Sequence, residues 1–139
     1  MFPAHITIDD LRRLVPNTLL ERIGIEFTEL GGDFIRARMP VDEKTHTPFG
    51  LLHGGASVAL AETLGSVGAA LLIDTQKQAA VGLEINANHV RGVRTGWVTG
   101  TTRALHRGRS THIWETHVVD ERERLVCISR LTVAIIDKM

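Results

Sequence analysis

The chain has 139 residues, 43% of them hydrophobic, which suits one domain built around a single core. Sixteen basic and sixteen acidic side chains cancel, so no net charge favours nucleic acid or an anionic membrane, and neither is an expected partner. The first ten residues lack the apolar run of a signal peptide, and the lone Cys127 cannot form an internal disulfide. We therefore expect a cytoplasmic protein in which Cys127 is a small core residue.

The N-terminal third predicts two short helical segments and a hairpin. Thr7 is a plausible N-cap for a surface helix, and residues 17–22 add a further turn. Apolar residues alternate over residues 23–28, and again from Ile35 until Pro40 ends the pattern. The turn at 31–33 joins these two strands into a hairpin.

A long apolar stretch, residues 47–73, is the feature around which the rest is organised. Small residues and larger aliphatic ones follow each other from Gly54 onward, which predicts a central helix packed closely on all sides. Residues 54–73 are long enough to span a bilayer, but the charge of Glu62 and the lack of flanking aromatic or basic residues argue against a membrane span. A carboxylate inside such a helix is either paired or chemically active.

The second half predicts four strands, over residues 81–91, 97–106, 111–119 and 125–136, joined mostly by short turns. The expected fold is therefore a single α+β domain, residues 1–139, with about six antiparallel strands wrapped around one long helix. His112 and His117 fall on opposite faces of one strand, and no close-spaced ligand set accompanies them, so we expect no metal site.

Two motifs resemble a known family. The run Pro-Phe-Gly-Leu-Leu-His-Gly-Gly from Pro48, with Glu62 nine residues after His53, resembles the hotdog-fold acyl-CoA thioesterases of the phenylacetate-pathway and enterobactin-proofreading type. The run from Val81 to Arg91 resembles most closely the 1,4-dihydroxy-2-naphthoyl-CoA thioesterases of menaquinone synthesis. The resemblance implies that Glu62 is the catalytic carboxylate, that the Gly54 amide polarises the thioester carbonyl, and that His53 orients it.

The same resemblance implies a substrate in which coenzyme A is the leaving group, with no separate cofactor, and a homodimer that pairs into a homotetramer. Basic side chains at a strand end and in a later turn suit the phosphates of coenzyme A, although a solvated basic rim explains them too. The residues expected to bind substrate are Phe49, Ser66, Val67, Gly82, His89, Arg91, His106, Arg109 and Ser110.

The spacing of Gly54 and Glu62 predicts a site shared between two chains. Eight residues of helix separate them, which is about 12 Å at 1.5 Å per residue. A carbonyl and its attacking water are only about 3 Å apart. One chain therefore supplies the Gly54 amide and its partner supplies Glu62, and a symmetric dimer carries two such sites.

Thr47 departs from the family pattern, in which Gln usually precedes Pro-Phe-Gly. We count Thr47 as a catalytic position, expect a slower enzyme than its relatives, and expect Thr47→Gln to raise turnover. The sequence leaves open whether Glu62 is a general base or a nucleophile. Two other functions stay possible: a hydratase or dehydratase of the same fold, and a non-catalytic acyl-CoA binding module.

Overall fold

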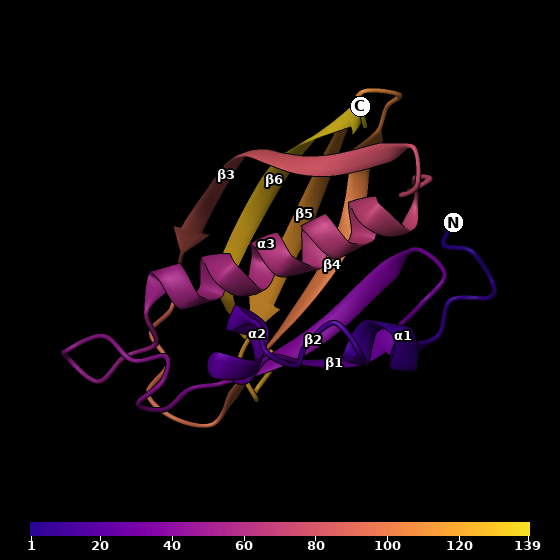
Figure 1. Ribbon diagram of the computed structural model, residues 1–139. Helices are drawn as coiled ribbons and strands as arrows, with labels where there is room; N and C mark the ends of the chain where they lie inside the picture. The colour runs from indigo at the N-terminus through magenta and orange to yellow at the C-terminus, as the bar shows by residue number, and fades with distance from the viewer.

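The computed structural model describes residues 1–139 and consists of one antiparallel sheet curved around one long helix (Figure 1). This architecture confirms the predicted fold class. The sheet has six strands in the order β1-β2-β4-β5-β6-β3. The strands are β1 (Glu26–Leu30), β2 (Phe34–Pro40), β3 (Gln78–His89), β4 (Trp97–Arg107), β5 (Thr111–Val119) and β6 (Leu125–Asp137), and the helices are α1 (Ile8–Arg12), α2 (Leu19–Arg22) and α3 (Gly54–Leu71).

Most element boundaries agree with the sequence pattern. The β1–β2 hairpin forms as expected and β2 ends at Pro40, which lacks the N–H that a further ladder bond requires. β1 begins later than predicted, because Gly24 takes a positive φ of 79° and the Ile25 N–H binds the Leu20 carbonyl at 2.9 Å. β3 pairs with β6 and not with β4, so the chain crosses the sheet after α3 to reach the far edge.

Small residues let α3 approach the sheet closely. A Cβ on Gly68 would lie 2.7 Å from the Trp114 ring, and one on Gly65 would lie 2.8 Å from the Leu131 side chain. Gly100 on β4 faces Leu64 in the same way, at 2.9 Å. These contacts explain Gly65 and Gly68, since a larger side chain at either position would push α3 off the sheet.

The expectation that α3 is packed on all sides is wrong for the single chain. The fully buried residues of α3 form one stripe that faces the sheet, whereas Ala59, Glu62, Thr63, Ser66 and Val67 are only half-buried. The reason is that the sheet covers one side of the helix alone, as Figure 1 shows. The other side is a ridge of small and medium side chains that includes Glu62.

The two edges of the sheet differ. β1 has five residues, and the Arg12 guanidinium of α1 donates to its Phe27 carbonyl at 3.2 Å. β3 has twelve residues, pairs only with β6, and exposes 42% of Val81 and 64% of Leu83. The alternation over residues 81–87 therefore does not bury one face throughout. A bulge between Gly82 and Glu84 interrupts the register at Leu83, and the strand lies at the rim of the sheet.

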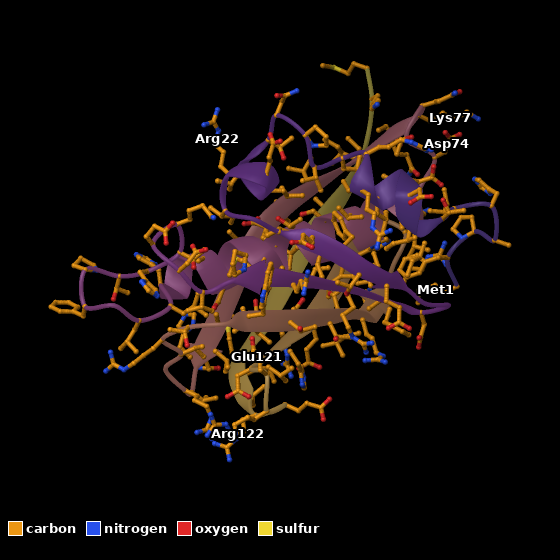
Figure 2. All side chains as sticks on the ribbon, turned by 90° about the horizontal axis from the view of Figure 1, so that it is seen from below. Met1, Arg22, Asp74, Lys77, Glu121 and Arg122 are labelled. Atoms are coloured by element: carbon orange, nitrogen blue, oxygen red, sulfur yellow. The ribbon has the colours of Figure 1, made fainter.

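The sheet has two ends that carry different loops. Figure 2 shows Glu121 and Arg122, in the β5–β6 hairpin, far from Asp74 and Lys77, which follow α3.

His112 on β5 is buried at 2% exposure while His117 is exposed, as the strand pattern predicts. Cys127 is also buried, which confirms its place in the core, and burial raises the pKa of its thiol. None of the helices is both long enough and apolar enough to cross a bilayer.

Candidate active site

The N-terminus of α3 presents a backbone donor that the chain itself leaves free. His53 is the N-cap, and its Nδ1 atom accepts a hydrogen bond of 2.8 Å from the Gly55 N–H. The Ala56 N–H binds the His53 carbonyl at 3.0 Å, but the Gly54 N–H has no acceptor. A free N–H at the positive end of an 18-residue helix is suited to stabilise negative charge on an oxygen atom.

The loop that leads into α3 is held by Thr47. Its Oγ1 atom accepts from the Phe49 N–H at 3.1 Å and the Leu51 N–H at 3.4 Å. The Thr47 N–H donates to the Leu51 carbonyl at 2.7 Å, and the Gly50 N–H donates to the Thr47 carbonyl at 3.1 Å. The hydroxyl thus fixes the turn in which Phe49 is 84% exposed. A Gln at position 47 gives up these two acceptor contacts, so its effect on turnover depends on what its longer amide reaches.

A hollow of about 500 Å³ lies between this loop and the end of β3, and we call it the amide hollow. The His89 ring covers Gly54, because a Cβ on Gly54 would lie 2.9 Å from His89 Nε2. The structure therefore places Thr47, Phe49, Gly54, His89 and Arg91, all candidate site residues from the sequence, around one hollow. The lining residues are Thr47, Phe49, Leu51, Leu52, Gly54, Ser57, His89, Val90, Arg91, Gly92 and Val126.

Glu62 lies in a different hollow, also of about 500 Å³, which we call the carboxylate hollow. Its carboxylate forms no hydrogen bond or ion pair within the chain. Gly82 of β3 makes room for it, since a Cβ there would lie 2.9 Å from Glu62 Oε2. Ser66 and Val67 line this hollow beside Glu62, as expected. The lining residues are Leu14, Leu19, Leu20, Ala59, Glu62, Thr63, Ser66 and Val67.

Three residues assigned to substrate binding lie elsewhere. His106, Arg109 and Ser110 belong to the β4–β5 turn region, and the adjacent Arg107 donates to the Leu72 carbonyl just after α3, at 3.2 Å. His89 and Arg91 lie instead beside Gly54, where α3 begins. Within one chain, the two basic groups predicted to hold coenzyme A are therefore at opposite ends of α3.

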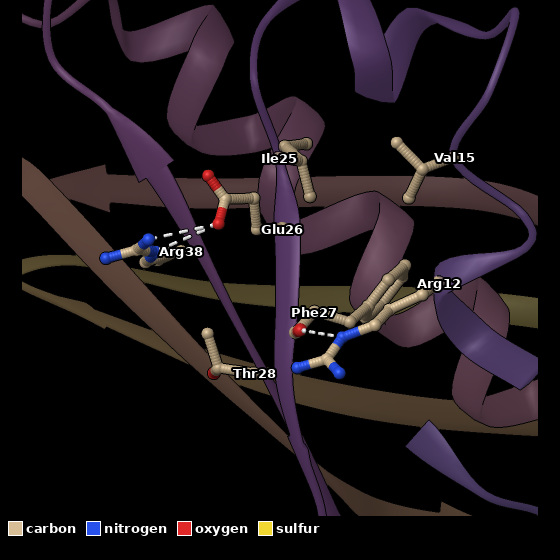
Figure 3. A pocket seen from close by; sticks show the side chains of 7 residues that line it. All are labelled: Arg12, Val15, Ile25, Glu26, Phe27, Thr28 and Arg38. Carbon is tan, nitrogen blue, oxygen red and sulfur yellow. Dashed lines mark hydrogen bonds and ion pairs between the residues drawn. The ribbon is translucent and has the colours of Figure 1, made fainter. Parts of the chain in front are cut away.

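A third hollow, of about 600 Å³, has no such chemistry. It lies between α1 and β1, as Figure 3 shows, and is lined by Arg12, Val15, Ile25, Glu26, Phe27, Thr28 and Arg38. Its charged groups already have partners: Arg38 donates to Glu26 at 3.0 Å and lies 3.9 Å from the centre of the Trp97 ring, and Arg12 binds the Phe27 carbonyl. It contains neither a free backbone donor at a helix start nor an unpaired carboxylate.

Sequence reasoning missed the contribution of the N-terminal segment to the carboxylate hollow. Leu14, Leu19 and Leu20 line it, although the pattern predicted only a surface helix there. The available signal was an excess of large apolar residues in two very short helical turns. Leu14 and Leu19 remain 49% and 57% exposed.

Comparison with known proteins identifies the family of this chain. The model of the thioesterase superfamily matches residues 49–127. The proofreading thioesterase EntH of Cronobacter turicensis is 50% identical over 135 residues, which cover 97% of this chain and 98% of EntH. The crystal structure of a glutamine-to-alanine variant of thioesterase PA1618 from Pseudomonas aeruginosa aligns with a TM-score of 0.95 and 44% identity, over 99% of both chains.

A smaller relative from Staphylococcus aureus, SAV0944, aligns with a TM-score of 0.84 and 44% identity, over 87% of this chain and 100% of its own. That structure is of a glutamate-to-alanine variant, and a glutamine-to-alanine variant of the same protein aligns with a TM-score of 0.82. The chain belongs to the thioesterase superfamily and has its hotdog fold. It is a thioester hydrolase of the acyl-CoA thioesterase type.

Proposed function

We propose that this protein hydrolyses an aromatic acyl-CoA thioester at sites that two subunits share. The observation that carries the proposal is the pair of unsatisfied groups on α3: a free Gly54 N–H in the amide hollow and an unpaired Glu62 in the carboxylate hollow. The first group suits the carbonyl oxygen of a thioester, and the second suits the water that attacks it.

The chemistry assigned to these groups is acyl transfer to water. The Gly54 N–H and the α3 dipole stabilise the negative charge that develops on the carbonyl oxygen. Glu62 accepts the proton of the attacking water, or attacks the carbonyl carbon itself and is then released by water. By either route the carbon–sulfur bond breaks, an oxygen atom of water ends in the carboxylic acid, and coenzyme A leaves as the thiol.

One chain alone does not place the two groups around one carbonyl. They are eight residues apart on a regular helix, about 12 Å along its axis. They also open into separate hollows that share no lining residue. A second copy that brings its own Glu62 to the Gly54 amide completes the site, and symmetry then forms it twice.

The exposed edge of β3 supports this arrangement. A long unpaired edge strand with exposed Val81 and Leu83 is a template for antiparallel pairing with a second copy. His89 of β3 lies over Gly54, and Gly82 of β3 lies against Glu62. Residues of β3 are therefore next to both reactive groups. If His89 lies opposite the partner's Gly82, neighbouring strands about 4.8 Å apart bring Gly54 close to the partner's Glu62.

The same pairing joins the two basic groups. The β3 strands run in opposite directions, so the end of one strand, with His89 and Arg91, lies beside the start of the other. The β4–β5 turn of the partner, with Arg109 and Ser110, is at that end, because the Ile135 N–H binds the Ser110 carbonyl at 2.9 Å and Ile135 lies opposite Ala80 near the start of β3. We propose that these groups together bind the phosphates of coenzyme A.

The proposed acyl preference is supported by the residues that line the carboxylate hollow. Aliphatic side chains and two hydroxyls, from Thr63 and Ser66, surround Glu62, which suits a ring with polar substituents such as 1,4-dihydroxy-2-naphthoyl. The name of EntH points to proofreading as a second role.

In SAV0944 the replaced glutamine and glutamate are fifteen positions apart, as are Thr47 and Glu62 here, which supports the assignment of both positions to the site.

The test is Glu62→Gln, which keeps the size of the side chain and removes its basicity. We expect turnover of benzoyl-CoA and 1,4-dihydroxy-2-naphthoyl-CoA, followed by thiol release, to fall at least about a hundredfold while binding persists. Glu43→Gln, which changes an exposed carboxylate in the loop after β2 that lines neither hollow, serves as the control. Glu62→Gln turnover within a few-fold of the parent would disprove the assignment.

A further inference from the structure

Two large apolar side chains of the N-terminal segment face the hollow that contains Glu62. Leu14 follows α1 and Leu19 begins α2, and they are 49% and 57% exposed. Both line the carboxylate hollow together with α3. No part of the family motifs includes them, because those begin at Pro48.

The hollow has a floor and two sides. The floor is the half-buried ridge of α3, with Ala59, Thr63 and Val67. Glu62 is on the side toward β3, because its carboxylate lies against Gly82. Figure 1 shows the N-terminal segment on the other side of α3, next to β1 and β2. Leu14 and Leu19 therefore lie across the ridge from Glu62.

The backbone that carries these leucines is held firmly in place. Leu11 is 1% exposed in the core, and Arg12 binds the Phe27 carbonyl. The Thr18 hydroxyl donates to the Val15 carbonyl at 2.6 Å, and the Ile25 N–H donates to the Leu20 carbonyl at 2.9 Å. A fixed segment that presents two leucines beside an unpaired carboxylate offers a preformed apolar wall and not a mobile tail.

We propose that Leu14 and Leu19 form the distal wall of the acyl pocket and thereby limit the length of the acyl group that is hydrolysed. The inference rests on the proposed function: with the thioester carbonyl at Glu62, the acyl group extends along the α3 ridge toward the two leucines. Removing the wall admits longer acyl groups, and a bulkier side chain there rejects them.

The experiment measures kcat and KM for straight-chain acyl-CoAs from acetyl to palmitoyl, with benzoyl-CoA as a ring-sized reference. Leu14→Ala combined with Leu19→Ala is expected to raise the ratio of kcat/KM for long over short chains by about tenfold, and Leu19→Trp to lower it by a similar factor. The control is Leu105→Ala, which removes a side chain that is 52% exposed on β4 and lines neither hollow.

The outcomes separate the two levels of the proposal. A parent protein that hydrolyses no acyl-CoA would overturn the proposed function and this inference with it. An active parent whose leucine variants have the same circular dichroism, the same assembly state and an unchanged chain-length profile would overturn the inference alone. A uniform loss of kcat at every chain length would also overturn it, since that pattern indicates a structural role.

Discussion

At the start of α3, His53 caps the helix and Gly54 leaves its N–H free. Because His53 Nδ1 accepts from the Gly55 N–H, a neutral ring carries its proton on Nε2 and can donate to an incoming carbonyl oxygen. The Gly54 N–H has no acceptor in the chain. Two donors of different kinds are therefore available at one point, where helix geometry already favours an anion.

Replacing Gly54 by Pro tests the amide directly. Proline is well tolerated at the first position of a helix, and the lost N–H has no partner within the chain. We expect Gly54→Pro to lower kcat about a hundredfold or more, the usual effect of removing one donor to a developing oxyanion. Gly54→Ala places the same Cβ near His89 but keeps the N–H. If the two variants have equal activity, the amide has no role and the effect is steric.

The residue types of this site could be predicted from the sequence, whereas the arrangement around them could not. His53, Gly54 and Glu62 follow from the motif and from the rule that helix starts bind anions. The double hydrogen bond to the Thr47 hydroxyl depends on how residues 47–51 turn, which no periodicity encodes. Leu14 and Leu19 line the same hollow as Glu62 because the N-terminal segment folds beside α3, which brings distant parts of the chain together.

At the scale of elements, we expect the unpaired edge of β3 to determine how two copies assemble. It is long, pairs on one side only, and exposes Leu83 more than half. β1 at the other edge is shorter and has its Phe27 carbonyl bonded to Arg12. This difference between the two edges favours β3 as the edge at which we expect a second copy to add.

Leu83→Arg is expected to prevent this pairing. A charge near the middle of the exposed strand removes apolar area from the proposed interface and leaves an unpaired charge buried there. Light scattering after gel filtration should then show a monomer, with native circular dichroism and without thioesterase activity. Thr28→Arg, on the opposite edge strand, is expected to keep the assembly and the activity of the parent. An active Leu83→Arg monomer would exclude a shared site.

His112 on β5 gives the fold a dependence on pH. Burial lowers the pKa of His112 below its ordinary value of 6.5, and the charges of Arg107 and His106 lower it further. The unfolded chain therefore binds a proton that the folded chain does not. The free energy of unfolding should decrease as pH falls through about 6.5 and level off below the pKa of the folded state.

Urea unfolding at pH 7.5 and at pH 5.5 measures this dependence. We expect His112→Leu to lose less stability between the two pH values than the parent does, because the buried titrating group is gone. His117→Leu, which changes an exposed histidine on the opposite face of β5, should behave like the parent. Equal losses in His112→Leu and the parent would assign the acid sensitivity to other groups.

The elements themselves were largely predictable, because strand and helix periods differ and Pro40 and the turns mark the ends. The order of the strands was not. Nothing in the pattern of β3 says that it pairs with β6 across the sheet, and its bulge at Leu83 moves side chains that strict alternation would bury. The partial exposure of α3 also depends on which side the sheet covers.

At the scale of the whole molecule, the proposed function makes the single chain an incomplete enzyme. Its two reactive groups lie in different hollows, and its two basic groups lie at different ends of α3. We expect pairing of two copies along β3 to remove both separations. The spacing of Gly54 and Glu62 leads to the same prediction from the sequence, and we expect two such dimers to associate into a tetramer.

Mixing two inactive chains tests the shared site most directly. Glu62→Gln and Gly54→Pro chains, unfolded together in equal amounts and refolded, form mixed dimers as half of the product. Each mixed dimer has one intact site, with Gly54 of the first chain and Glu62 of the second, so we predict about a quarter of the parent activity from two inactive parents. Activity that stays at the level of the separate variants would contradict a site shared between subunits.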